Sequence, residues 1–527
     1  MEDVIQSQKN WNDFQTNGKV GVITTLFSEQ FLSETYELIP LSFENYKEDI
    51  ELNDIDTVFI DNDLFETDHV WYRKNRGHIV NYLKNNNKNI CVIKNTSLDV
   101  AQTFKKAFVL EIEPDASDFK YSGLLLKMPL ILNTQIYNPI NTVKNIDVTH
   151  FYIGNSTTTL DNKKYNLEFK PNVKINSVLK LSRVYLEELI KTLKTTKILY
   201  INKNNAVDIV TLRYIEYIAY LNSTYVIYDH KFEFNSPFES DSTDFKFNNN
   251  MMTVFLRNPE YSFKKTLVRQ RQIFMNHSTI MKANLKEFLK KGRLELSFPK
   301  ISVITSTNRR ENLEFYLEQM NHQRYVSLEI NLVTHGFELS DAEKEYLKKF
   351  SKFDINIIHA EKFENLGACL NKCLQLCTHP VIAKIDDDDY YLENYMIDQW
   401  LALKYSRADV VGKSESYYYF EADDLIALRK KGEHSKYSDF IMGATIMAKS
   451  DIIQELLFAD IPRAVDTNFL RRVVESEGKI YIGNAYEMCV FRSGNTDDHT
   501  WQVNNLAMLK SADIVGYGNP IPYVSVK

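Results

Sequence analysis

The sequence predicts an α/β protein in which two Rossmann-like units in tandem precede a third α/β domain. Two observations support this prediction. Strand-like and helix-like segments alternate along most of the 527 residues, which is the rhythm of βαβ units. A short apolar run, 381–385, ends in four consecutive carboxylates, Asp386 to Asp389. Ligands of open α/β sheets bind at the carboxyl ends of strands, so this run marks a candidate site.

The composition is that of a folded protein with several domains. A chain of this length exceeds what one core supports, so we expect two to four domains. Hydrophobic residues make up 44% and charged residues 25% of the chain. The net charge of −7 gives no overall attraction to nucleic acid or to an anionic membrane. Because no leader or membrane-spanning segment is visible, we expect a cytoplasmic protein, with peripheral association at the inner face of the cell membrane left open.

The first 260 residues contain two cycles of alternating elements, which we assign to domains 1–140 and 141–260. Helices are expected around 78–85 and 211–221. The expected strands are Lys19 to Thr25, Thr57 to Ile60, Asn89 to Ile93, Phe108 to Ile112, Val148 to Gly154, Thr196 to Ile201, Thr224 to Tyr228 and Met252 to Leu256. Neither unit carries G-x-G-x-x-G or a Walker loop, so no nucleotide site is predicted there.

A basic amphipathic helix, 262–292, is expected to bridge the units, within a linker at 261–298 that Gly292 and Pro299 close. Contact with phosphate or a membrane surface is the alternative use of this helix. From Lys300 a new α/β series begins, and 299–527 is expected to form one domain. Its first elements are strands at 301–306, 328–334 and 355–359, with helices at 311–319 and 367–377.

Three of the five cysteines, Cys369, Cys373 and Cys377, recur every four residues and share one helical face with leucines. A zinc site usually contains a close cysteine pair, which this spacing lacks. We therefore expect packed thiols in the core of the third domain.

The run Asp386 to Asp389 indicates a divalent metal. At the end of a buried strand, mutual repulsion would raise carboxylate pKa values unless a cation neutralised them. Mg²⁺ and Mn²⁺ take oxygen ligands and bridge to substrate phosphates. A solvated acidic turn remains the alternative, whereas the ligand spacing of a common calcium loop is absent. The run therefore points to nucleotide-diphosphate chemistry.

The last third of the chain resembles glycosyltransferase family 2 over roughly residues 299 to 510. The similar elements are the strand Ile301 to Arg309 with its Asn308-Arg309 ending, Asn365-Leu366-Gly367 with Lys372 downstream, the D-x-D-D element Asp386 to Asp389, Asp466 at the position of the catalytic base, and the end segment Arg492 to Trp501. The resemblance implies a GT-A fold with a mixed central sheet and an inverting transfer from a nucleotide-activated sugar.

The resemblance also implies roles for individual residues. Asp388 would be the principal ligand of Mn²⁺ or Mg²⁺, Asp386 would contact the metal or the nucleotide ribose, and Asp466 would be the general base. From its own chemistry, His499 could complete the metal shell, pair with the leaving diphosphate or serve a structural role. The implied donor-binding residues are Thr305, Thr307, Asn308, Arg309, Asn365, Lys372, Asp386, Asp387 and Arg492. Read from the residues alone, Asp466 could instead cap the helix that follows it. Trp501 could stack on a sugar ring or lie in the core.

Three positions depart from the family pattern. Lys372 stands where arginine is usual, and Val465 replaces the first acid of the pair that contains Asp466. His335 follows the second strand, where many members have an acidic contact to the base or ribose. The third departure leaves the donor nucleotide open.

The first 290 residues look like the CgeB-type region, a pair of GT-B-like Rossmann units found before such a domain. The similar segments are Lys19 to Thr25, Asp56 to Ile60, His69 to Arg73 and the helix 269–289. This resemblance implies an accessory or degenerate sugar-transferase module.

The predicted function is the metal-dependent transfer of a sugar from a nucleotide-sugar, with UDP the favoured nucleotide, to an acceptor hydroxyl. The expected acceptor is a bacterial cell-surface glycopolymer such as teichoic acid or capsule, another glycan or polyol-phosphate, or a protein. The chain could form a homo-oligomer. The alternatives are a catalytically degenerate nucleotide-sugar-binding scaffold and a nucleotidyltransferase, although the latter would want a basic or glycine-rich phosphate loop that Ser306 to Arg310 offers only in part.

Overall fold

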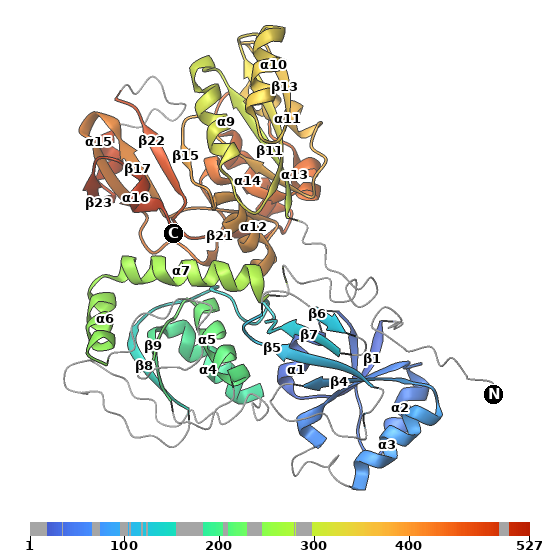
Figure 1. Cartoon of the computed structure of the whole chain (residues 1–527). Coiled ribbons are helices and arrows are strands. Elements are labelled where there is room, and N and C mark those ends of the chain that lie inside the picture. Colours follow the sequence, from blue (N-terminus) through green and yellow to red (C-terminus); the bar gives the residue numbers. More distant parts are fainter. Residues whose placement is uncertain are drawn as a thin grey trace. The chain divides into compact units, whose positions relative to one another are not determined.

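The structure is a computed structural model of the chain. It describes residues 18–33, 35–65, 74–94, 104, 107–116, 120–122, 125–153, 183–203, 209–228, 245–278, 280, 298–494 and 505–527. The chain divides into two compact units, Met1–Leu296 and Ser297–Lys527 (Figure 1). Each unit is described by itself.

The first sheet of the N-terminal unit has seven strands in the order β2-β1-β3-β4-β5-β7-β6. Its strands are β1 (Lys19–Ile23), β2 (Glu37–Pro40), β3 (Thr57–Asp61), β4 (Asn89–Lys94), β5 (Phe108–Glu113), β6 (Lys120–Ser122) and β7 (Leu125–Pro129). All neighbours pair in parallel except β6 and β7. Helices α1 (Leu26–Leu32), α2 (Tyr46–Leu52) and α3 (Lys74–Asn85) and the 3₁₀ helix η2 (Asn62–Phe65) connect the strands. The arrangement is Rossmann-like, as the sequence predicts.

The second sheet of this unit is parallel and has three strands in the order β10-β9-β8. They are β8 (Ile146–Ile153), β9 (Thr196–Lys203) and β10 (Tyr225–Tyr228). Four helices accompany them: α4 (Arg183–Thr195), α5 (Ile209–Leu221), α6 (Phe245–Arg257) and α7 (Pro259–Asn276). The basic helix expected at 262–292 begins at Pro259 and ends earlier than expected, at Asn276, since Ser278 already forms a β-bridge with Leu132; 281–297 lie outside the described residues.

The strand expected at Met252 to Leu256 is wrong, because these residues form the end of α6. A short apolar run fits a buried helix as well as a strand. Met252 and Phe255 are buried on one helical face, and the Phe255 ring lies 4.4 Å from that of Tyr225 on β10. Packing of this face against the sheet decides the outcome.

The C-terminal unit is built on a mixed sheet of eight strands in the order β13-β12-β11-β14-β20-β16-β21-β19. The strands are β11 (Lys300–Thr307), β12 (Ser327–His335), β13 (Asp354–Ala360), β14 (Val381–Lys384), β16 (Val410–Gly412), β19 (Lys436–Tyr437), β20 (Met447–Lys449) and β21 (Ile480–Ile482). The first four pair in parallel, and β20 runs antiparallel between β14 and β16. The carboxyl ends of β11 and β14 therefore meet at one edge.

A second sheet of five strands follows the order β15-β22-β17-β18-β23. The strands are β15 (Tyr390–Tyr391), β17 (Ser416–Phe420), β18 (Leu425–Arg429), β22 (Met488–Arg492) and β23 (Ala512–Tyr517). The helices of this unit are η5 (Arg310–Asn312), α9 (Leu313–Asn321), α10 (Asp341–Phe350), α11 (Leu366–Leu374), α12 (Tyr395–Ser406), η6 (Glu421–Asp423), η7 (Gly443–Thr445), α13 (Ser450–Leu456), α14 (Val465–Glu475), α15 (Asn505–Leu509) and α16 (Ile521–Val524). β15 directly follows the aspartate run, so this run lies where the two sheets meet.

Helix α11 fills the core of the C-terminal unit as expected. Cys369 and Cys373 are fully buried among apolar side chains of α14 and the large sheet. Burial raises the pKa of the Cys377 thiol to about 12, so this group is a neutral thiol at physiological pH. Gly367 lets α11 approach the chain before α14, since a Cβ there would lie 2.0 Å from the carbonyl oxygen of Ala459.

The fold class predicted from the sequence is confirmed: tandem parallel Rossmann-like sheets are followed by an α/β domain with a mixed central sheet. In the part of the chain that the structure describes, none of the helices combines the length and the apolar character needed to cross a bilayer.

Candidate active site

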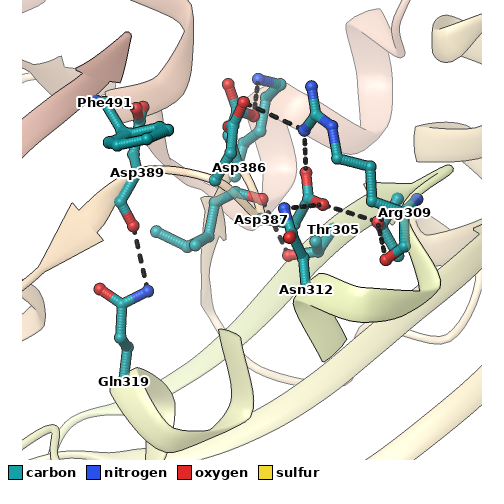
Figure 2. Close-up of polar contacts among 12 residues, drawn as sticks. Thr305, Arg309, Asn312, Gln319, Asp386, Asp387, Asp389 and Phe491 are labelled. Carbon is teal, nitrogen blue, oxygen red and sulfur yellow. Dashed lines mark hydrogen bonds and ion pairs between the residues drawn. The ribbon is translucent and has the colours of Figure 1, made fainter. Parts of the chain in front are cut away.

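The candidate site lies at the carboxyl edge shared by β11 and β14. In the parallel register of these strands, Ile304 lies opposite Lys384. Thr307 is the last residue of β11 and Arg309 follows it, and Figure 2 shows Arg309 near Asp386 and Asp387, which follow β14. Both strands are buried over most of their length and are followed by polar residues, as expected of strands inside a covered parallel sheet.

Asp387 is the best-supported carboxylate of the run. Its Oδ2 atom accepts hydrogen bonds from the Thr307 hydroxyl at 2.7 Å and from the Asn312 side-chain amide at 3.1 Å, and Arg309 Nη1 lies 3.1 Å from Oδ1 (Figure 2). Burial raises the pKa of Asp387, while Thr307 and Arg309 act to lower it. Asp387 thereby fixes Arg309 and Asn312 around the site.

Asp388 shares the guanidinium of Arg309. Its Oδ2 atom lies 3.0 Å from Arg309 Nη1. Burial, followed by the negative charge of Asp386, raises the pKa of Asp388 to about 6. The carboxylates of the run therefore repel one another, and one arginine offsets this repulsion only in part.

Asp389 faces away from the other three carboxylates. Its Oδ1 atom accepts the backbone N–H of Phe491 on β22 at 3.0 Å, and its carbonyl oxygen accepts the side-chain amide of Gln319 on α9 at 3.0 Å (Figure 2). The carboxyl group is buried, and burial raises its pKa well above the usual range. Asp389 anchors the turn to the second sheet.

Asp386 and Asp466 share the ammonium group of a buried lysine. Lys384 Nζ lies 2.6 Å from Asp386 Oδ1 and 3.5 Å from Asp466 Oδ2. Burial acts to lower the pKa of Lys384, but the charges of the two aspartates outweigh it, and the pKa is raised. The Asp386 backbone N–H donates to the Tyr391 hydroxyl at 3.1 Å.

Asp466 is the second residue of α14 and does not cap it. The N-cap residue is Ala464, at a φ of +60°, and no side chain bonds the first turn there. Burial raises the pKa of Asp466, while Lys384 lowers it. Within the described part of the chain, its Oδ1 atom is buried and has no hydrogen-bond partner. The side chain as a whole is 27% exposed, and a partly exposed carboxylate with a raised pKa is suited to accept a proton from a bound hydroxyl.

The remaining predicted donor-binding residues lie in different settings. Thr305 is fully buried and hydrogen-bonds the Ile385 carbonyl and the Tyr316 hydroxyl, both at 2.9 Å. It therefore supports the site from beneath, and its contact with the donor stays a prediction. Asn308 is exposed after β11. Arg492, at the end of β22, is buried, and burial lowers its pKa.

Asn365 and Lys372 lie at the two ends of α11. Asn365 is the N-cap residue, and its amide donates to Asp460 at 2.8 Å. Lys372 Nζ lies 2.7 Å from Glu364 Oε1, and this hydrogen bond lowers the pKa of Glu364. Asn365 and Lys372 thus already have protein partners. His499 and Trp501 lie outside the described residues.

Two site residues escape the sequence prediction. Lys384 interrupts an apolar strand immediately before the aspartates, and a charge inside a buried run is a usable signal. Asn312 has no local signal, because only the fold brings it to Asp387, 75 residues further along the chain.

The donor set fits a divalent cation that the substrate completes. No three carboxylate, imidazole or thiol groups converge on one point among the described residues. Mg²⁺, however, is usually held by one or two carboxylates together with substrate phosphates and water. Asp388, with its raised pKa, and its neighbour Asp386 supply such oxygen ligands. A cation there would relieve the repulsion that Arg309 leaves.

Residues 302–454 match the family model described as glycosyl transferase family 2. This domain is therefore of the glycosyltransferase class, as the sequence predicts. The match includes the strand β11 and the aspartate run, and it ends before Asp466 and Arg492. The roles of these two residues and the CgeB-like character of the first 290 residues stay predictions.

Two named relatives are glycosyltransferases. The amylovoran biosynthesis glycosyltransferase AmsE of Erwinia amylovora is 37% identical over 83 residues, which are 16% of this chain and 31% of the relative. The O-antigen biosynthesis glycosyltransferase WbnJ of Escherichia coli is 23% identical over 161 residues, which are 29% of this chain and 63% of the relative. The chain thus spans less than two thirds of either relative.

Solved structures show weaker likeness. TarS of S. aureus, residues 1–349 with UDP-GlcNAc, is 14% identical at a TM-score of 0.30, covering 37% of this chain and 59% of that one. The mannosyltransferase PcManGT of Pyrobaculum calidifontis, with GDP-Man and Mn²⁺, is 13% identical at a TM-score of 0.29, covering 44% and 67%. Neither carries an argument at this similarity.

Proposed function

We propose that the C-terminal unit transfers a glycosyl group from a nucleotide-sugar to an acceptor hydroxyl, with inversion and with the help of Mn²⁺ or Mg²⁺. One observation carries the proposal: an acidic run inside the glycosyl transferase family 2 match ends β14, and a half-buried carboxylate from α14, Asp466, lies across Lys384 from it. Together they supply a cation-binding end and a proton-accepting end.

The donor end needs positive charge, because a nucleoside diphosphate leaves as an anion. Asp388 and Asp386 would hold the cation, which supplies Lewis-acid stabilisation of the diphosphate when bound. Arg309 already lies between Asp387 and Asp388 and is placed to turn toward a phosphate oxygen. Arg492, buried at the end of β22, would be a second cation for the same group.

The acceptor end needs a base. The Asp466 carboxylate would accept the proton of the acceptor hydroxyl while that oxygen attacks the anomeric carbon from the face opposite the diphosphate. Raising the pKa of Asp466 by burial strengthens it as a base, and the ammonium of Lys384 keeps it ionised. The two effects suit general-base catalysis near neutral pH.

The substrates are the less constrained part of the proposal. UDP is the favoured donor nucleotide, and a cell-surface glycopolymer such as teichoic acid or capsule is the favoured acceptor, by analogy with relatives named for amylovoran and O-antigen biosynthesis. His335 at the end of β12 stands where an acidic residue usually contacts the donor nucleotide, so the identity of the nucleobase must be established by experiment. A glycan, a polyol-phosphate or a protein acceptor and work at the inner membrane face belong to the same proposal.

The direct test is incubation of the purified chain with UDP-, GDP-, CDP- and TDP-sugars plus Mn²⁺, followed by chromatography of the products. Release of a nucleoside diphosphate together with a transferred or hydrolysed sugar is the expected result. Release of sugar 1-phosphate, the leaving group when the nucleotidyl group is transferred, would indicate a nucleotidyltransferase instead. Binding of a nucleotide-sugar without turnover by any acceptor mixture would favour a scaffold.

A further inference from the structure

Lys384 is a charged residue at the end of a strand whose four residues are all buried. Its side chain is 3% exposed, and its backbone N–H donates to the carbonyl oxygen of Ile446, directly before the neighbouring strand β20, at 2.8 Å. A buried ammonium is costly unless it is paired and hydrogen-bonded. The strand therefore fixes the position of Lys384, and its ammonium group cannot exchange its protein partners for water without a large cost.

The partners of Lys384 come from separate elements. Nζ lies 2.6 Å from Asp386 in the aspartate run, 3.5 Å from Asp466 on α14, and donates to the Gly443 carbonyl at 3.4 Å. Asp386 belongs to the donor end of the proposed site, and Asp466 is its proposed base. One ammonium group thus joins the two halves of the reaction.

Asp466 has little freedom beside this ammonium group. A Cβ on Gly443 would lie 2.0 Å from Asp466 Oδ2, so the backbone of η7 packs directly against this oxygen. Lys384 lies on Oδ2, while Oδ1 has no partner among the described residues. The two contacts fix the orientation of this carboxyl group.

We propose that Lys384 is a positioning residue that holds Asp466 through Oδ2 and so fixes the orientation of this carboxyl group toward the acceptor hydroxyl. This inference rests on the proposed transfer. In this role Lys384 touches neither the sugar nor the transferred proton, and it acts through Asp466. It also keeps a positive charge beside Asp466 when Asp386 engages the donor, which couples donor binding to the geometry of the base.

The test uses Lys384→Met and Lys384→Gln in the full chain. Gln retains one hydrogen-bond donor and is expected to fold even where Met does not. Lys413→Met is the matched control, since Lys413 is equally buried and donates to the Asn484 carbonyl at 2.6 Å, outside the site. Thermal unfolding, calorimetric binding of UDP with Mn²⁺, and transfer kinetics are measured for each variant.

The expected result is a split between binding and turnover. In Lys384→Gln the kcat for transfer falls about 10- to 100-fold, the loss typical of a residue that orients a reacting group. The Kd for UDP with Mn²⁺ and the acceptor KM stay within about threefold of their values in the unaltered chain, which is a small change in binding free energy. Lys413→Met keeps kcat and lowers the unfolding temperature only.

Two outcomes overturn the inference while the proposed function stands. A folded Lys384→Gln with the kcat of the original chain shows that Asp466 needs no such support. A parallel loss of donor binding and kcat shows that Lys384 maintains the donor end rather than the base. Absence of UDP binding and transfer in the unaltered chain instead overturns the proposed function itself.

Discussion

Arg309 Nη1 lies 3.0 Å from Asp388 Oδ2, so an arginine occupies the place beside the carboxylate that the proposed cation would share. Burial and neighbouring negative charge raise the pKa of Asp388 to about 6 even with this arginine present. The aspartate run is therefore short of positive charge without a bound cation, and this shortage leads to measurable consequences.

Arg309→Gln should leave the aspartate run with still less compensating positive charge. Removing the guanidinium leaves Asp387 and Asp388 with less compensation and removes one contact to the donor phosphates. We expect the unfolding temperature without metal to fall, and Mn²⁺ to raise it by more than in the unaltered chain. Scanning calorimetry with Mn²⁺ or EDTA measures both. An equal Mn²⁺ effect in the two proteins would show that Arg309 and the cation do not share a site.

The metal-free protein should lose stability as pH rises from about 4 to about 6. The pKa of Asp388 is raised in the folded state from 3.8 to about 6, so the folded state binds more protons than the unfolded state in this window. Stability from this group is complete below the lower value and is lost as pH rises through the upper one. Unfolding temperatures across pH 4 to 7 in EDTA measure the effect.

Asp388→Asn is the control for this pH dependence. Asn does not titrate, so the difference in unfolding temperature between the two proteins should change in favour of Asn as pH rises through this window. A difference that stays constant across the range would remove Asp388 as the cause.

Asp466→Asn should greatly slow transfer and leave donor binding unchanged. The amide cannot accept the proton, so kcat should fall by about 10²- to 10⁴-fold, the range for a general base. Asp466 lies on α14 beyond the diphosphate contacts, so metal-dependent UDP binding should remain. Turnover within tenfold of the unaltered chain, in a folded variant, would show that another group is the base.

Gly443→Ala should disturb the base without removing a charge. The added methyl group would lie 2.0 Å from Asp466 Oδ2, and relief of such overlap typically costs about 1–3 kcal/mol. We expect a lower unfolding temperature and reduced kcat with UDP binding retained. Gly494→Ala is the matched control, because its methyl group would meet only ordinary contact with Ala422 at 3.5 Å.

The alternation of strands and helices is predictable from the sequence because apolar periodicity is local. The parallel strands β11, β12 and β14 form within one or two residues of the predicted ranges. The strand predicted at Met252 to Leu256 is wrong, since such a short, mainly apolar run fits a buried helix equally well, and the packing of Phe255 on Tyr225 decides between them.

The site is predictable in composition and less so in orientation. The run Asp386 to Asp389 is visible as a motif, but the pairing of Asp389 with Phe491 turns that carboxylate away from its neighbours. Similarly, the Thr305 hydroxyl donates to the Ile385 carbonyl and is buried in the core. Such outcomes depend on contacts between residues about 80 to 100 positions apart, which single-sequence patterns do not encode.

The most direct test of the central claim is calorimetric titration of the chain with UDP, GDP, CDP and TDP, each with Mn²⁺ and then with EDTA, repeated on Asp388→Asn. The account predicts that one nucleotide binds only with Mn²⁺, and that Asp388→Asn weakens this binding by roughly 30-fold or more, as for removal of one partner of a buried charge pair. Nucleotide binding that is unchanged by EDTA and by Asp388→Asn, or the absence of binding of all four nucleotides, would contradict the account.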